Sequence, residues 1–419
     1  MAKYVVRNGI LLILLAATVT SCSFAKLRKD LVNVDQAIHL FGGKVTSVDL
    51  DSRSIIVVAF AESQGDRILG FNLMSGPGEF QFRSERQPTY FFGFDDRNKD
   101  LIFQASEPYV WADGGRPQDP EKASTEAMTI PIVIAENNQS PIPQQLVGEP
   151  LGSHWDDNQR FNIGTVSSLA NPLFSMEQAK KGLWQPFAFV EDGGTGIHFL
   201  EPYDPDRIPI LFVHGVNGSP QNFTALIESI DRSRFQPWVL SYPSGLRLSL
   251  VAEGLQQMLE VLHRQHDFDS LHLVAHSMGG LVSRGSVNLC AQTDTCKYLR
   301  TYTTLSTPWG GVASAQSGVE WAPTVVPVWR DLDPASDFIT SLFDTPLPED
   351  LPYHLIFGFR QDSIFGSQSS DGVIVLSSQL RDAAQEQAQT IRGYDEGHVS
   401  ILSSEAVARK LNQILMQSN

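Results

Sequence analysis

The sequence has little cysteine, a deficit of positive charge and no long hydrophobic run. Three cysteines among 419 residues are too few for a fold stabilised mainly by disulfides. Lysine and arginine number 31 against 47 aspartates and glutamates, a net charge of −16, whereas non-specific nucleic-acid binding requires basic patches. The longest apolar run holds about ten residues, and a helix needs ~20 to span a bilayer.

What remains is the composition of a folded protein. Hydrophobic residues make up 42% of the chain and charged residues 19%, which excludes a wholly disordered chain. At about 150 residues per domain, the length predicts two or three domains. Composition indicates no activity, so function has to be inferred from local motifs.

The N-terminus has the pattern of an export signal. A short basic start precedes the apolar run Ile10–Ala17, which is followed by Val-Thr-Ser-Cys at residues 19–22. This ending resembles the lipobox of bacterial lipoproteins. The resemblance implies a signal peptide over residues 1–22, a lipid on Cys22 and, with Ser23 beside it, attachment to the outer membrane of the cell envelope, facing the periplasm or the exterior. An ordinary secretory peptide with an incidental cysteine is the alternative.

Export to an oxidising compartment favours a disulfide between the other two cysteines, Cys290 and Cys296, which are close in the sequence. Such a bond would close a small loop, and two free thiols are the alternative. The spacing around them does not match that of metal ligands. We expect neither a metal nor a cofactor.

Residues 40–135 have the pattern of a small β-sandwich. Three segments resemble the carboxypeptidase regulatory-like (transthyretin-like) sandwich: Gly-Lys-Val-Thr from Gly43, Pro-Gly-Glu-Phe from Pro77, and the run Tyr90–Asn98. The resemblance implies an accessory domain. Short β-rich runs separated by Gly, Pro, Asp and Ser clusters lie at 45–48, 54–60, 67–73, 80–82, 89–94 and 130–135.

One turn in this region carries oxygen-bearing side chains at alternate positions. Asp96, Asn98 and Asp100 are followed by Glu107 at the twelfth position, as in calcium-binding loops. Leu101 stands where such a loop needs glycine, and the flanking residues favour strands over helices. We therefore predict a solvated hairpin turn rather than a calcium site.

The pattern changes in the second half of the chain. We predict a linker or wrapping segment over 136–200, because residues 136–165 are rich in Asn, Gln, Pro, Gly and Asp and lack periodicity. From 201 to 419, apolar strand runs alternate with amphipathic stretches, which predicts an α/β domain with a mostly parallel sheet flanked by helices. An insertion over 312–352 is predicted to form a pocket wall or lid, with a packed cap as the alternative.

The most informative segment is Leu-His-Leu-Val-Ala-His-Ser-Met-Gly-Gly at residues 271–280. An apolar strand runs straight into Ser277, and a helix begins at once. The small residues Ala275 and Gly279 permit the sharp turn that lifts the Ser277 hydroxyl out of the sheet. The segment resembles the nucleophile elbow of α/β-hydrolases, in the form found in lipases and GPI-inositol-deacylase-like esterases. The family pattern is Gly-x-Ser-x-Gly, and Ala275 replaces its first glycine.

A nucleophilic serine needs a base and an acid, which follow it in this fold in the order serine, acid, histidine. His398 lies in a loop before the last helix and is the predicted base, whereas His354 enters a strand. Asp371 begins an Asp-Gly-x-Val segment that resembles the one carrying the acid in lipases. Asp362 is the alternative acid, and Asp395 is too near the base along the chain.

Two backbone N–H groups are expected to bind the oxyanion, one from Met278 after the nucleophile and one from an earlier loop. His-Gly-Val at 214–216 resembles the lipase His-Gly-x segment, which implies Val216 as the second donor. His214 is expected to support this loop at the edge of the substrate pocket. Ser-Thr-Pro-Trp-Gly-Gly at 306–311 resembles another lipase segment and implies that Trp309 borders the pocket.

These residues predict a serine hydrolase that cleaves carboxylic esters through an acyl-enzyme. The expected partners are an ester or lipid substrate and a membrane reached through the lipid anchor, but no nucleic acid. Protein partners are not indicated by the sequence. An acyltransferase would use the same residues, and a catalytically silent envelope binding or scaffold protein is the alternative from another class.

Overall fold

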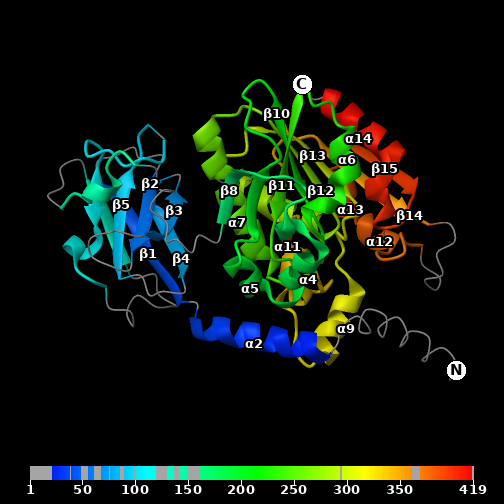
Figure 1. The fold of residues 1–419 in the computed structure, drawn as a ribbon, viewed down its shortest axis with the longest axis horizontal. Coiled ribbons are helices and arrows are strands. Elements are labelled where there is room, and N and C mark those ends of the chain that lie inside the picture. The colour runs from blue at the N-terminus through cyan, green and yellow to red at the C-terminus, as the bar shows by residue number, and fades with distance from the viewer. Residues whose placement is uncertain are drawn as a thin grey trace. The chain divides into compact units, whose positions relative to one another are not determined.

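The computed structural model describes most of the chain (Figure 1). Its described residues are 21–37, 39–48, 55–60, 68–74, 76–84, 89–98, 100–118, 130–135, 141–149, 161–292, 295–360 and 369–417. Most of the predicted signal peptide therefore lies outside them. The chain divides into a β unit, Val32–Gln159 with His263–Gln265, and an α/β unit that takes in the rest, including the N-terminal segment up to Leu31. Within the described ranges, no helix is both long and apolar enough to cross a membrane.

The β unit consists of two small sheets, with strand orders β4-β1-β7 and β3-β2-β5-β6. Side chains of both sheets share one apolar core, to which Phe41 and Ile132 contribute from the first sheet and Val57 and Phe91 from the second. The predicted all-β region is confirmed, and its likeness to the carboxypeptidase regulatory-like sandwich stays a prediction. The strands are β1 (His39–Val48), β2 (Ile55–Phe60), β3 (Ile68–Met74), β4 (Gly78–Ser84), β5 (Tyr90–Asp95), β6 (Tyr109–Trp111) and β7 (Ile130–Ala135).

The turn that follows β5 satisfies its carboxylates with its own backbone. Asp96, which is fully buried, accepts hydrogen bonds from the backbone N–H groups of Asp100 and Leu101. Glu107 accepts from the N–H groups of Arg97 and Gln104, each at 3.0 Å. No group of three or more His, Cys, Asp or Glu side chains in the described part of the chain is arranged to hold a metal ion.

Glu107 is predicted to make the stability of the β unit depend on pH. Burial raises the pKa of its carboxyl to about 7 from an ordinary 4.5. Because the folded-state pKa is the higher one, the group's contribution of ~3 kcal/mol to the free energy of unfolding is complete below about pH 4.5 and is lost as pH rises through about 7. Denaturant titrations between pH 4 and 8 should show this loss, and Glu107→Gln should reduce it. Equal pH dependence in the two proteins would contradict the prediction.

The α/β unit is built on one eight-stranded sheet of order β15-β14-β13-β12-β10-β11-β9-β8. The six strands from β10 to β15 are parallel, β9 runs antiparallel to β11, and β8 is parallel to β9. Their bounds are β8 (Phe161–Val166), β9 (Thr195–Phe199), β10 (Ile208–Val213), β11 (Phe235–Ser241), β12 (Leu271–His276), β13 (Leu299–Leu305), β14 (Tyr353–Phe359) and β15 (Thr390–Asp395).

Alternate residues of the central strands face two layers of helices, because side chains alternate along a strand. Leu211 and Val213 of β10 pack with residues of α7 (Leu248–His266) and α8 (Met278–Gln292). Ile210 and Phe212 pack with residues of α6 (Thr224–Ser229) and α14 (Glu405–Gln417). A mostly parallel sheet with crossover helices on both faces is the α/β-hydrolase fold that the sequence predicts.

The sheet begins earlier in the chain than predicted. Strands β8 and β9 lie within 136–200, together with α4 (Met176–Trp184) and α5 (Pro186–Glu191). Residues 161–200 are thus part of the α/β unit rather than a linker. Glycine obscures the strand pattern here, since Gly164 has a φ of +73° and Gly196 lies against the backbone of Asn162.

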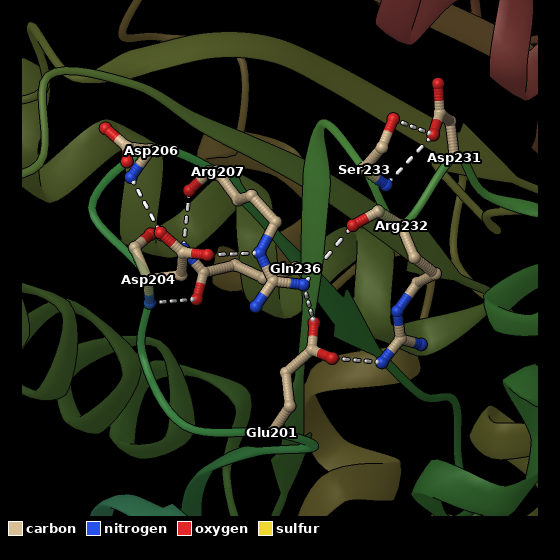
Figure 2. Close-up of polar contacts among 8 residues, drawn as sticks. All are labelled: Glu201, Asp204, Asp206, Arg207, Asp231, Arg232, Ser233 and Gln236. Atoms are coloured by element: carbon tan, nitrogen blue, oxygen red, sulfur yellow. Dashed lines mark hydrogen bonds and ion pairs between the residues drawn. The ribbon is translucent and has the colours of Figure 1, made fainter.

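A polar network fixes the edge of the sheet where β10 and β11 begin (Figure 2). The Arg207 guanidinium donates from Nη1 to Glu201 Oε1 at 2.7 Å and from Nε to Asp204 Oδ2 at 2.9 Å. Arg232 Nη2 reaches the other Glu201 oxygen at 2.8 Å, and Gln236 Nε2 donates to the Asp204 carbonyl at 2.7 Å. The network thereby holds the starts of the strands, at the edge opposite their carboxyl ends.

Candidate active site

Ser277 lies at the turn between β12 and α8 in a strained backbone conformation. Its φ is +54°, a left-handed value that is uncommon for a residue other than glycine, and the residue is 4% exposed. A Cβ on Gly279 would collide with the carbonyl oxygens of Val213 and His214, which end the neighbouring strand. The turn therefore requires glycine two residues after the serine, as the elbow motif predicts.

A line of hydrogen bonds joins Ser277, His398 and Asp371. The Ser277 Oγ lies 2.8 Å from His398 Nε2, and His398 Nδ1 lies 2.7 Å from Asp371 Oδ2. The carboxylate accepts a hydrogen bond from Nδ1–H, so the ring proton stays on Nδ1 and Nε2 is free to accept the hydroxyl proton. The structure thus brings together three side chains that are far apart in the sequence.

The Asp371 carboxylate is buried, and both of its oxygens accept hydrogen bonds. Its residue is 1% exposed, and its Oδ1 accepts hydrogen bonds from the N–H groups of Val373 at 2.9 Å and Ile374 at 2.7 Å. The Asp371 carbonyl also accepts a hydrogen bond from the backbone N–H of His398 at 3.0 Å. The backbone and side chain of Asp371 together fix the position of the imidazole.

The loop after β10 passes directly over the nucleophile. Gly215 packs so closely that a Cβ on it would lie 2.8 Å from the Cβ of Ser277. Tyr242 stacks on the His214 ring at 4.2 Å and donates from its hydroxyl to the His214 carbonyl at 2.6 Å. Burial lowers the pKa of His214 to about 4, so this histidine is neutral at pH 7. In the part of the chain that the structure describes, no backbone carbonyl outside the helices and strands accepts a hydrogen bond from the N–H of Val216 or of Met278.

His276, immediately before the nucleophile, contacts the loop that carries His398. The sequence predicts no role for it. Its Nε2 lies 2.7 Å from the backbone carbonyl of His398 and must donate, because a carbonyl can only accept. The two imidazole rings are 4.9 Å apart, and burial lowers the pKa of His276 to about 3. The histidine before Ser277 is visible in the motif, but the carbonyl that it contacts belongs to a residue far away in the sequence.

We predict that His276 positions His398 for proton transfer. Replacing it with leucine should lower kcat for ester hydrolysis by about tenfold with little change in KM, because misplaced proton acceptors reduce rates without weakening binding. His276→Gln keeps an N–H donor near the Nε2 position and should recover most of the loss. Steady-state kinetics on the two variants, with circular dichroism to verify folding, test this. Equal losses in both would indicate a packing role instead.

The other candidate acids and bases lie elsewhere. His354, on β14, contacts Thr390 through Nδ1 at 2.9 Å, as expected for a strand histidine. Asp395 ends β15 and is exposed, and Asp362 lies outside the described residues.

Trp309 is buried, and its place at the border of the pocket stays a prediction. It is 1% exposed, and its ring packs against Phe343 at 5.5 Å and Tyr353 at 5.9 Å. Among the described residues, no ring contact or hydrogen bond joins it to the Ser277 relay. Its large apolar ring is accommodated in the core beneath the insertion.

The structure links Cys290 and Cys296 by a disulfide, with the two Cα atoms 5.3 Å apart. The bond connects the end of α8 with the segment before β13. Cys22 lies in the first turn of α2 (Ser21–Ala37), a helix that has no predicted counterpart, and its side chain is outside the described part.

The insertion over 312–352 forms α9 (Ala313–Trp321), α10 (Pro327–Leu332) and α11 (Asp337–Ser341), and two short helices follow later, α12 (Leu376–Gln379) and α13 (Asp382–Glu386). Arg247 at the start of α7 pairs with Asp331 at 2.6 Å. The fully buried Arg284 of α8 donates to the Thr345 carbonyl at 2.7 Å, and Arg381 donates to the Ile339 carbonyl at 2.7 Å. The second half of the insertion is thus hydrogen-bonded to the body of the unit.

Comparisons with known proteins indicate a relationship to esterases. A model of the family described as "Putative serine esterase (DUF676)" matches residues 248–338, which hold α7, the serine turn, α8, β13 and the first helices of the insertion. The match covers less than half of the chain. Compared with curated protein sequences, the chain has no match.

Solved lipase structures are among those to which the chain is similar. The mature lipase BlEst2 of Bacillus licheniformis is 18% identical, with a TM-score of 0.42 over 52% of this chain and 97% of the lipase. Lipase B of Aspergillus fumigatus is 12% identical, with a TM-score of 0.38 over 50% of this chain and 55% of the lipase. Phospholipase PlaB of Legionella pneumophila is 18% identical, with a TM-score of 0.36 over 41% and 45% of the two chains.

Proposed function

We propose that the protein is a serine hydrolase that cleaves carboxylic esters. The observation that carries the proposal is the relay of two short hydrogen bonds, 2.8 Å from Ser277 to His398 and 2.7 Å from His398 to Asp371. A nucleophile, a base in the matching tautomer and a buried acid are the parts that acyl transfer requires. The family description of residues 248–338 agrees with this chemistry.

The proposed reaction proceeds through an acyl-enzyme. The Ser277 oxygen attacks the ester carbonyl carbon while its proton passes to His398 Nε2. The carbon–oxygen bond to the alcohol then breaks, and His398 returns the proton to the departing alcohol. Water attacks the acyl carbon in the same way, which releases the carboxylic acid and restores the Ser277 hydroxyl.

The backbone N–H groups of Met278 and Val216 are the proposed oxyanion donors. Met278 begins α8, where the positive end of the helix dipole favours negative charge. Val216 follows Gly215, which packs on the nucleophile. In known cases, the loss of one such donor costs ~10²–10³ in rate.

A fluorophosphonate probe on the purified full chain tests the proposal. Such probes phosphonylate an activated serine, so wild type should be labelled and Ser277→Ala should not. Ser283→Ala is a matched control, since Ser283 is also buried on α8 but lies outside the relay, and it should label normally. A folded wild-type protein that fails to label would favour the catalytically silent alternative.

We further propose that Cys22 carries a lipid that anchors the protein to the cell envelope. The support is the lipobox-like Val-Thr-Ser-Cys at residues 19–22 and the apolar run that precedes it. Mass spectrometry of the membrane-extracted protein should find Cys22 at the N-terminus with added acyl mass, and Cys22→Ser should remove that mass. A mature N-terminus at any other residue would contradict the proposal.

A further inference from the structure

The first turns of α2 are attached to the α/β unit. Asp30, which is 8% exposed, accepts hydrogen bonds from the backbone N–H groups of Phe187 at 3.1 Å and Ala188 at 3.2 Å. These N–H groups belong to the first turn of α5, where no partner exists within the helix. Leu27 is fully buried in the core of the unit, and the Phe24 ring contacts the Trp184 ring at 5.3 Å. The segment after Cys22 therefore has a fixed place on the folded unit.

A series of contacts connects this segment with the insertion. Trp184 of α4 contacts Trp329 of α10, with ring centroids 5.9 Å apart. Gly318 of α9 packs against the Trp329 ring, and Trp321 at the end of the same helix is 81% exposed. In the view of Figure 1, the beginning of α2 and helix α9 are drawn at the same end of the α/β unit, in agreement with the contacts of Phe24 with Trp184 and of Trp184 with Trp329.

The same elements adjoin the edge of the sheet that carries the relay. Gly245, in the loop after β11, donates a hydrogen bond to the Gly182 carbonyl of α4 and accepts one from the Val328 N–H of α10. The neighbouring Ser244 hydroxyl accepts a hydrogen bond from Asn217 N–H, in the loop over the nucleophile, at 3.0 Å. Because β10, β11 and β12 are parallel, their carboxyl ends meet at one edge of the sheet.

The exposed side of α2 is basic in an otherwise acidic protein. Lys26, Arg28 and Lys29 are exposed, and residues 21–29 contain no aspartate or glutamate, although the net charge of the chain is −16. At physiological ionic strength, the acidic residues that lie more than about 10 Å from a membrane surface are largely screened from it. The electrostatic interaction with a surface that α2 touches is therefore determined by this local basic patch. Its sign is complementary to anionic lipid headgroups.

We propose that Lys26, Arg28, Lys29 and Trp321 form a membrane-docking face that lays the active-site edge of the sheet against an anionic lipid bilayer. The site then takes its ester from lipids of that bilayer. Exposed tryptophan is favoured at the membrane interface, and a lipid on Cys22 would enter the bilayer beside the basic patch. This inference rests on the proposed hydrolase function and goes beyond it by assigning the substrate class and the orientation.

Charge reversal tests the docking face. Lipidated full-length protein is compared with Lys26→Glu/Arg28→Glu/Lys29→Glu on vesicles of phosphatidylethanolamine with a quarter phosphatidylglycerol. Hydrolysis of the vesicle phospholipid should fall by about tenfold or more, since each basic residue contributes roughly fivefold to binding at an anionic surface. Hydrolysis of soluble nitrophenyl butyrate should be unchanged. Lys297→Glu/Arg300→Glu/Arg409→Glu makes the same change in charge at exposed positions elsewhere and should leave both rates intact.

A fluorescent probe reports the orientation directly. An environment-sensitive fluorophore on Trp321→Cys should brighten and shift to shorter wavelength on the vesicles, whereas the same probe on Met416→Cys, which is also exposed but lies on α14, should not. A silent probe at 321 on bound protein, or equal losses in the two charge variants, would overturn the inference. Failure of wild type to hydrolyse nitrophenyl butyrate would instead refute the proposed function, and the probe would still decide the docking.

Discussion

Replacing Ser277 with alanine is expected to lower kcat/KM for nitrophenyl esters by at least about 10⁴-fold. The hydroxyl 2.8 Å from His398 is the atom proposed to form the acyl bond, and alanine offers no oxygen in its place. Folding should be retained, because removal of this hydroxyl creates almost no cavity. Initial rates on a short-chain ester, with circular dichroism on the same samples, measure both effects.

Two comparisons make the Ser277 result specific. Ser283→Ala, buried one turn and a half further along α8, should keep the wild-type rate. Ser277→Ala that retains more than a tenth of the wild-type activity would mean that another group attacks the ester, and the assignment of the nucleophile would fall.

Asp371→Asn is expected to lower kcat by about 10³–10⁴-fold with a nearly unchanged KM. The N–H groups of Val373 and Ile374 require an oxygen at the Oδ1 position, so the asparagine amide nitrogen must face His398. That nitrogen donates, and therefore His398 Nδ1 has to accept and the ring proton moves to Nε2. An Nε2 that carries a proton cannot accept the one from Ser277. Full kinetics between pH 6 and 10 measure the effect.

Two other aspartates that follow Ser277 in the sequence serve as controls for Asp371. Asp395→Asn changes an exposed residue at the end of β15, and Asp362→Asn changes the alternative acid of the sequence prediction. Both should leave kcat within about twofold of wild type. A large loss in Asp362→Asn together with a small one in Asp371→Asn would reverse the assignment.

The sequence predicts the parts of the site that depend on local pattern and chain order. The turn at Ser277 is recognisable because an apolar strand, a serine and small residues follow one another without a gap. His398 could be assigned because only two histidines follow the serine and His354 enters a strand. The positioning contact of His276 could not be predicted, since its acceptor is a backbone carbonyl in a loop 122 residues away.

Packing between distant segments accounts for what the sequence did not predict. Strand β8 contains Gly164 with a positive φ, and in β9 Gly196 lies against the backbone of Asn162, so the alternation of polar and apolar residues in these strands is weak. Helix α2 begins at the end of the predicted export signal, and its packing is defined by contacts with α4 and α5.

The buried guanidinium of Arg284 bears on how a substrate could gain entry. It donates to Asn288, Gln387 and the Thr345 carbonyl, and its Cζ atom lies 4.8 Å from the centroid of the Phe343 ring. To swing outward as one flap, the insertion would have to break the hydrogen bond from Arg284 to the Thr345 carbonyl and the ion pair of Arg247 with Asp331, and it would remove the Phe343 ring from the guanidinium, which is unfavourable. Within the insertion, the part that these contacts leave free to move is therefore the stretch around α9, before the chain reaches Asp331.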